Sequence, residues 1–62
     1  MITTVILYVA LCTTPNQCNA YEPSSWTATS QEELSQVYEQ CAAQEREWMK
    51  EDGYKESDCY EG

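Results

Sequence analysis

The chain has 62 residues, with 11 acidic and three basic side chains, four cysteines and no histidine, and its net charge at pH 7 is −8. A chain of this length forms one domain at most and buries only about 60% of the surface that its unfolded form exposes, so its core is thin. Its only bases are Arg46, Lys50 and Lys55, which are too few to neutralise a phosphate backbone and argue against direct nucleic-acid binding.

The first segment, residues 3–12 (TTVILYVALC), is uncharged and rich in β-branched side chains, which predicts a strand. Alternation places Ile6 and Tyr8 on one face and Val5 and Leu7 on the other, so both faces are apolar. A single helix can cover only one of these faces. The other face favours contact with a second copy of the protein, and a homodimer is therefore one expected assembly.

The same apolar run has a competing interpretation as a secretory signal peptide over residues 1–20, with Cys18, Asn19 and Ala20 near the cleavage site. A signal peptide carries a positively charged residue before its apolar run, and no Lys or Arg precedes this one. The missing charge argues against a signal peptide, and the interpretation stays open as an alternative. The run is also shorter than the roughly 20 apolar residues that a transmembrane helix needs. We therefore expect no membrane span.

The next segment contains Pro15 and Asn16, which favour a tight turn, and a returning strand is expected from Cys18. The hairpin would extend over residues 3–28, with Pro23 confined to an edge or a bulge because proline cannot donate to a strand ladder. Trp26 has two interpretations, since so large a side chain serves either as a core anchor or as a hot spot for a partner.

Residues 31–52 carry the start, repeat and stop signals of one long amphipathic helix. Ser30 followed by Glu33 fits a capping box, in which each side chain satisfies a free backbone N–H of the first turn. Gly53 provides the left-handed residue that commonly ends a helix. The apolar stripe is broken only at Glu45 and consists of Leu34, Val37, Tyr38, Cys41, Ala42, Trp48 and Met49.

The tail, residues 53–62, is expected to be a short third strand or an irregular segment held by Cys59. The helix rises about 18 Å from Cys41 to Gly53 at about 1.5 Å per residue. An extended tail returns about 20 Å at about 3.3 Å per residue, which brings Cys59 level with Cys41. The sequence therefore predicts a single α+β domain over residues 1–62, in which an antiparallel hairpin packs against one long helix.

The four cysteines favour two sequential disulfides. Cys12 and Cys18 flank the turn and face each other across the hairpin, while Cys41 and Cys59 are brought together by the returning tail. Reduced, buried thiols remain an alternative, especially in a bacterial cytoplasm. A zinc site made only of cysteines is a weaker alternative, because the spacings lack the close pairs that usually bind zinc.

Ten of the 11 acids lie from Glu32 onward, on the expected helix and tail. The cluster around Glu45 and Asp52 lacks convergent ligands, so we interpret it as solvated surface and predict no metal site. The acidic outer surface of the helix is the expected contact for a basic partner protein. The residues predicted to bind this partner are Glu32, Glu39, Glu47 and Glu51, with Trp26 as a hot spot.

Catalytic chemistry lacks its usual residues in this sequence. Without histidine, a serine or cysteine nucleophile has no common base. No two cysteines have the C-x-x-C spacing of a thiol oxidoreductase, and two glycines cannot make a glycine-rich phosphate loop. We expect a protein that is not an enzyme and uses no cofactor.

The layout of Val9-Ala10-Leu11-Cys12, the turn to Cys18, the mid-helix Cys41 and the closing Cys59-Tyr60 resembles very short cysteine-containing accessory proteins of tailed phages and prophages in enteric bacteria. The resemblance carries no catalytic or binding motif. It implies a phage accessory protein in the host cytoplasm that binds and inhibits a host factor.

The expected function is therefore non-enzymatic binding of a protein, such as a host protein that handles nucleic acid. Two alternatives stay open. One is a secreted or periplasmic disulfide-stabilised protein that has lost residues 1–20, and the other is a structural homo-oligomer.

Overall fold

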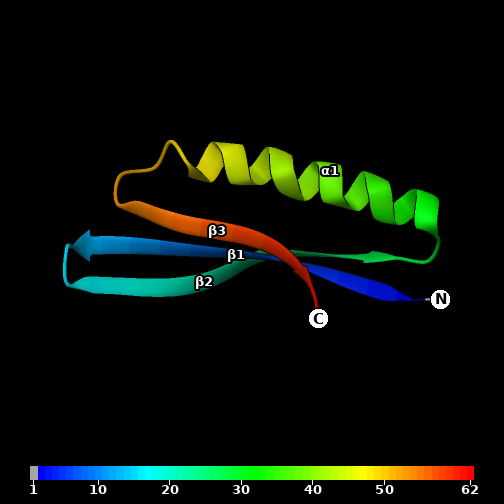
Figure 1. Ribbon diagram of the computed structural model, residues 1–62, viewed down its shortest axis with the longest axis horizontal. Helices are drawn as coiled ribbons and strands as arrows, with labels where there is room; N and C mark the ends of the chain where they lie inside the picture. Colours follow the sequence, from blue (N-terminus) through cyan, green and yellow to red (C-terminus); the bar gives the residue numbers. More distant parts are fainter. Residues whose placement is uncertain (1) are drawn as a thin grey trace.

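The N-terminal strand lies at the centre of a three-stranded sheet. In the computed structural model, which describes residues 2–62, β1 (Thr3–Thr14) pairs with β2 (Gln17–Ala28) on one side and β3 (Tyr54–Glu61) on the other. Both pairings are antiparallel, and α1 (Gln31–Trp48) runs along one face of the sheet (Figure 1). The α+β prediction is confirmed, and the tail, left open by the sequence, is a strand.

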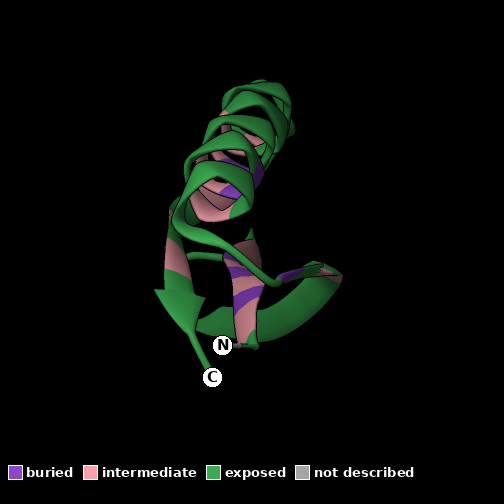
Figure 2. Cartoon of the chain, turned by 90° about the vertical axis from the view of Figure 1, so that its right-hand side faces the viewer, coloured by how far each residue is buried: buried purple, intermediate pink, exposed green. Residues whose placement is uncertain are grey.

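The core is a single layer between α1 and the face of β1 that it covers. Val5, Leu7 and Val9 alternate along that face and are fully buried. The helix contributes Val37 and Cys41, and the buried positions of the central strand and of the helix face each other in Figure 2. The predicted stripe on the helix therefore packs on one of the two apolar faces of β1.

The hairpin is continuous despite its proline. The pairing of β1 with β2 shifts register between Leu7 and Val9, next to the segment that contains Pro23. A bulge on an edge strand accommodates proline because neither position requires its missing N–H. Residues 17–28 consequently form one strand, which ends at the predicted end of the hairpin.

The helix begins at the predicted cap with one difference in its hydrogen bonds. Ser30 Oγ accepts a hydrogen bond from the backbone N of Glu33 at 3.1 Å, as expected. The carboxylate of Glu33, however, accepts from the backbone N and Oγ1 of Thr29, at 2.7 and 2.6 Å, rather than from the backbone of Ser30. The cap thus also ties the helix to the residue that directly follows β2.

The helix ends at Trp48, so the predicted end at residue 52 is wrong. The backbone N of Lys50 donates to the carbonyl of Glu47 at 3.2 Å, a tighter i to i−3 bond that closes the last turn. A turn over residues 49–53 then reverses the chain toward β3. Met49 is 52% exposed and does not belong to the buried stripe.

Gly53 has the left-handed backbone conformation expected of it, with φ of +84°. This angle lets the chain reverse and enter β3, whose Tyr54 pairs with Leu11. Among the described residues, no helix is both long and apolar enough to cross a lipid bilayer.

Candidate functional site

All four cysteines form disulfides in the predicted sequential pairs. Cys12 is bonded to Cys18, and Cys41 is bonded to Cys59. The first bond joins directly paired positions of β1 and β2 beside the hairpin turn. The second bond joins α1 to β3, with the two Cα atoms 6.3 Å apart. The first disulfide thus links β1 to β2, and the second links α1 to β3.

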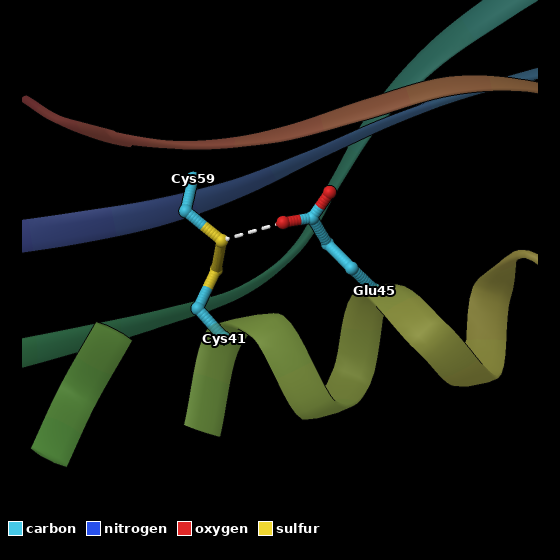
Figure 3. Close-up of side chains that lie close together, drawn as sticks. All are labelled: Cys41, Glu45 and Cys59. Carbon is cyan, nitrogen blue, oxygen red and sulfur yellow. Dashed lines mark hydrogen bonds between the residues drawn. A yellow bond between two sulfur atoms is a disulfide. The ribbon is translucent and has the colours of Figure 1, made fainter. Parts of the chain in front are cut away.

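Glu45 lies beside the disulfide between α1 and β3. It is one helical turn after Cys41, so the two side chains leave the same face of the helix. One carboxylate oxygen, Oε1, lies 3.1 Å from Cys59 Sγ (Figure 3). A sulfur atom in a disulfide carries no proton to donate, so in the oxidised protein this is a contact between a carboxylate and a sulfur.

The other oxygen of Glu45 is held by a short polar chain. Ser57 Oγ donates to Glu45 Oε2 at 2.6 Å. The hydroxyl of Tyr54 lies 2.7 Å from the same Ser57 oxygen and donates to it, because the single Ser57 proton is already given to Glu45. All three side chains are partly buried. The carboxylate is therefore fixed in place against the disulfide.

We call Cys41, Glu45 and Cys59 the sulfur–carboxylate cluster. Their ligand atoms lie within 4.8 Å of one another, and Cys41 is fully buried while the other two are half-buried. The sequence contained one sign of this cluster, which is the break that Glu45 makes in the apolar stripe. The position of Ser57 opposite Glu45 depends on the register of β3 and carried no signal.

The four predicted partner-binding glutamates do not form one continuous patch. Glu32 and Glu39 are exposed on the side of α1 directly away from Cys41. Glu47 is exposed on the flank of the helix and forms a salt bridge of 3.5 Å with Lys50, while Glu51 lies in the turn beyond the helix. The helix surface is therefore acidic but dispersed.

Trp26 faces the helix rather than solvent. It pairs with Val5 across the β1–β2 ladder, is half-buried, and packs against the core. This arrangement is the one expected of a core anchor.

The side of the sheet away from α1 contains the second apolar face of β1, which the sequence predicted to contact a second copy of the protein. The acids that β2 and β3 add to this side were not predicted. We call this side the open face, because α1 lies on the other side of the sheet (Figure 1). Strand alternation and the registers of β2 and β3 place aromatic and acidic side chains together there. The open face comprises Ile6, Tyr8, Ala10, Glu22, Glu56, Asp58 and Tyr60.

Each tyrosine of the open face donates a hydrogen bond to an acid on another strand, and the bond of Tyr60 crosses the central strand β1. Tyr60 OH reaches from β3 to Glu22 Oε2 on β2 at 3.0 Å, and this bond raises the pKa of Tyr60. Tyr8 OH lies 3.3 Å from Glu56 Oε1. Removal from water, and then the charge of Glu56, raise the pKa of Tyr8. Both hydroxyls therefore stay protonated at neutral pH, and both carboxylates are positioned.

The charged side chains assigned to the open face are all acidic. Its acids are Glu22, Glu56 and Asp58, and the sequences of β1 and β2 contain no basic residue. Lys55 is the one base of β3 and lies near the hairpin tip, beside Cys12 and Cys18. The negative charge of this face is thus not neutralised by neighbouring bases.

Comparison with protein-family models, curated proteins and solved structures finds no significant match to this chain. No relative therefore contributes a function or a set of site residues.

Proposed function

We propose that this chain is a non-enzymatic protein-binding protein whose open face contacts a basic surface on its partner. The observation that carries the proposal is the combination of Tyr8 and Tyr60 with three acids on one uncovered side of the sheet. Tyrosine is enriched at protein interfaces because it offers a large apolar area and a polar tip at low entropic cost. The acids select a partner of opposite charge.

The hydrogen bonds on the open face prepare it for binding. Tyr60 is 38% exposed, yet its ring is oriented by the bond to Glu22. An oriented side chain loses less conformational entropy when a partner docks than a free one does. The carboxylate of Glu22 also keeps acceptor capacity for a lysine or arginine of the partner.

A second copy of this chain is a poorer occupant of the open face. Two copies meeting there would bring Glu22, Glu56 and Asp58 of one against the acids of the other, and each chain has a net charge of −8. Like charges across an interface disfavour association. The homodimer stays a prediction, and the effect of salt on binding distinguishes it from a complex with a basic partner. Self-association would strengthen as salt is added, whereas binding of a basic partner would weaken.

The proposed partner is a protein that handles nucleic acid, because such proteins present basic surfaces built to meet phosphates. An acidic chain that occupies such a surface excludes the nucleic acid and acts as an inhibitor. The resemblance to phage accessory proteins favours a bacterial host protein and the host cytoplasm. Because that compartment normally keeps thiols reduced, the proposal requires that the chain binds its partner with its two disulfides either shielded from reduction or reduced. The secreted alternative differs in its fold, because cleavage after residue 20 would remove β1, the central strand.

The experiment is affinity capture from a bacterial lysate with the immobilised intact protein and two matched variants. Tyr60→Ala removes an aromatic ring from the open face. Tyr21→Ala is the control, because Tyr21 is similarly exposed at 47% but pairs with Val9, whose side chain points to the helix side of the sheet. Circular dichroism melting of both variants verifies that each is folded.

The proposal expects a basic protein that binds the wild type and Tyr21→Ala, is released by salt, and is lost with Tyr60→Ala. Added nucleic acid should compete with the chain for that protein. A captured protein that binds both variants equally, or that withstands high salt, would contradict the proposal.

A further inference from the structure

We propose that reduction of the Cys41–Cys59 disulfide converts the sulfur–carboxylate cluster into a zinc-binding site. The inference is independent of the open face, since the cluster lies on the other side of the sheet, between α1 and β3 (Figure 3). Two thiolates and a carboxylate are ligands that Zn²⁺ accepts. They come from two elements that the fold already holds together.

The geometry of the cluster suits a tetrahedral ion. Ligand atoms around zinc, at about 2.3 Å for sulfur and about 2.0–2.2 Å for oxygen, lie about 3.5–3.8 Å from each other. The three ligand atoms here already lie within 4.8 Å of one another, with Glu45 Oε1 at 3.1 Å from Cys59 Sγ. Opening the sulfur–sulfur bond supplies the space for the ion, and the fourth position is left to water.

The surroundings provide the support that metal ligands usually have. Ser57 Oγ holds the second oxygen of Glu45 at 2.6 Å, and Tyr54 holds Ser57. Partners of this kind orient a ligating carboxylate and increase metal affinity. Complete burial of Cys41 limits the access of competing water on the helix side.

The disulfide is converted into the zinc site in two steps, reduction and then metal binding. A dithiol reductant attacks the half-buried Cys59 sulfur as a thiolate, Cys41 leaves as a thiolate, and the second thiol of the reductant releases Cys59. The protein disulfide gains two electrons and two protons, and the reductant becomes a disulfide. Zn²⁺ then replaces the two thiol protons, which pass to solvent, and binds both thiolates and the ionised Glu45.

The other disulfide offers an internal contrast. Cys12 and Cys18 also become thiols on reduction, but among the described residues no carboxylate is grouped with them as Glu45 is with Cys41 and Cys59. Any zinc bound there has two protein ligands and is held more weakly. The double variant Cys12→Ala/Cys18→Ala therefore isolates the proposed site.

The test is titration of Co²⁺, and then competing Zn²⁺, into this double variant of the full chain after reduction by a phosphine, which competes little for the metal. We expect one cobalt per chain with the thiolate charge-transfer absorption and visible bands of a tetrahedral site. Adding Glu45→Gln should weaken binding by about tenfold or more, as loss of even a supporting partner does. Adding Glu47→Gln, on the exposed flank, should leave binding unchanged.

Three results would overturn the proposal. The first is the absence of a tetrahedral cobalt spectrum in the reduced double variant. The second is equal metal affinity of the Glu45→Gln and Glu47→Gln proteins. The third is equal metal binding by the oxidised and the reduced protein. The test also works if the reduced protein unfolds. In that case zinc must restore the helical circular dichroism signal, because binding and folding are then coupled, and its failure to do so contradicts the site.

Discussion

The backbone N of Cys12 donates a hydrogen bond of 2.7 Å to the carbonyl oxygen of Gly53, so the turn after the helix is attached to the end of the central strand. A Cβ atom at Gly53 would collide with the carbonyl oxygen of Cys12, and the residue also has a positive φ. Sterics and backbone conformation therefore both require glycine at this point. This contact positions β3, and with it the sulfur–carboxylate cluster.

Gly53→Ala should lower the free energy of unfolding by about 2 kcal/mol or more, since the left-handed conformation alone costs an alanine about 1–2 kcal/mol. Urea unfolding of the oxidised protein measures the loss. Gly62→Ala is the control, because its Cβ would meet only the movable side chains of Ile6 and Tyr60. Equal stability of the two variants would show that the turn tolerates a side chain.

Ser30→Ala should cost about 1 kcal/mol of stability, because Ser30 Oγ caps the backbone N of Glu33. Thermal unfolding followed by circular dichroism measures this change. Ser35→Ala, at an exposed position in the same helix, provides the comparison and should have little effect. A Ser30→Ala protein as stable as Ser35→Ala would contradict the role assigned to the cap.

Glu33 should make the stability of the helix start depend on acid pH. Hydrogen bonds from the side chain and then the backbone of Thr29 hold the pKa of Glu33 below its ordinary value of 4.5. A carboxyl whose pKa is lower in the folded state stabilises the fold above its unfolded pKa. This contribution is lost as the pH falls through the folded pKa.

The stability difference between wild type and Glu33→Gln should therefore be largest at neutral pH and shrink as the pH falls below 4.5. The comparison cancels the effect of the other acids, whose protonation also changes the net charge. Urea midpoints measured across the acid range provide the data. A difference that does not vary with pH would contradict the lowered pKa.

Tyr60 should ionise at a higher pH than an ordinary tyrosine, since its bond to Glu22 raises its pKa above 10.0. The associated stability is fully present below the unfolded pKa and is lost as the pH rises through the folded pKa. Titration of isotope-labelled tyrosine ring resonances measures the value directly. Glu22→Gln should move the pKa of Tyr60 back toward 10.0, and an unchanged titration would show that the bond does not form in solution.

The two disulfides should contribute different amounts to the free energy of unfolding. On the loop-entropy model, loss of Cys41–Cys59 costs about 3 kcal/mol and loss of Cys12–Cys18 about 2.4 kcal/mol. Cys41 is also fully buried, so its replacement by alanine loses packing as well. Unfolding of the two double alanine variants should rank Cys41→Ala/Cys59→Ala as the less stable, and the opposite ranking would contradict the account of the core.

The sequence carried enough information for the fold because its signals were local. The uncharged run before Cys12, the turn at Pro15, the cap at Ser30 and the glycine at position 53 each specify backbone geometry through nearby residues. The disulfide pairing followed from the lengths of the helix and the tail. The helix end was misjudged because Gly53 predicted the end of the helix, whereas the last turn already tightens at Lys50 and the left-handed Gly53 belongs to the turn into β3.

The candidate sites were less predictable because they depend on register between distant strands. The pairing of Tyr8 with Asp58, and the reach of Tyr60 to Glu22, follow from where β3 joins β1. Glutamates along a helix are visible in a sequence, whereas acids gathered from three strands are not. For this reason the predicted acidic contact was the helix. The sequence predicted the second face of β1 only as an apolar surface for another copy of the protein, and its acids emerged from the structure.

The most direct measurement of the central claim is the affinity of the captured basic partner for two variants of equal charge, across a series of salt concentrations. One variant is Glu22→Gln/Glu56→Gln/Asp58→Asn on the open face, and the other is Glu32→Gln/Glu39→Gln/Glu47→Gln on the helix. The open-face variant should bind more weakly and lose most of the salt dependence, while the helix variant should bind nearly as the wild type does. The reverse order, or equal affinities for the two variants, would contradict the open face as the binding surface.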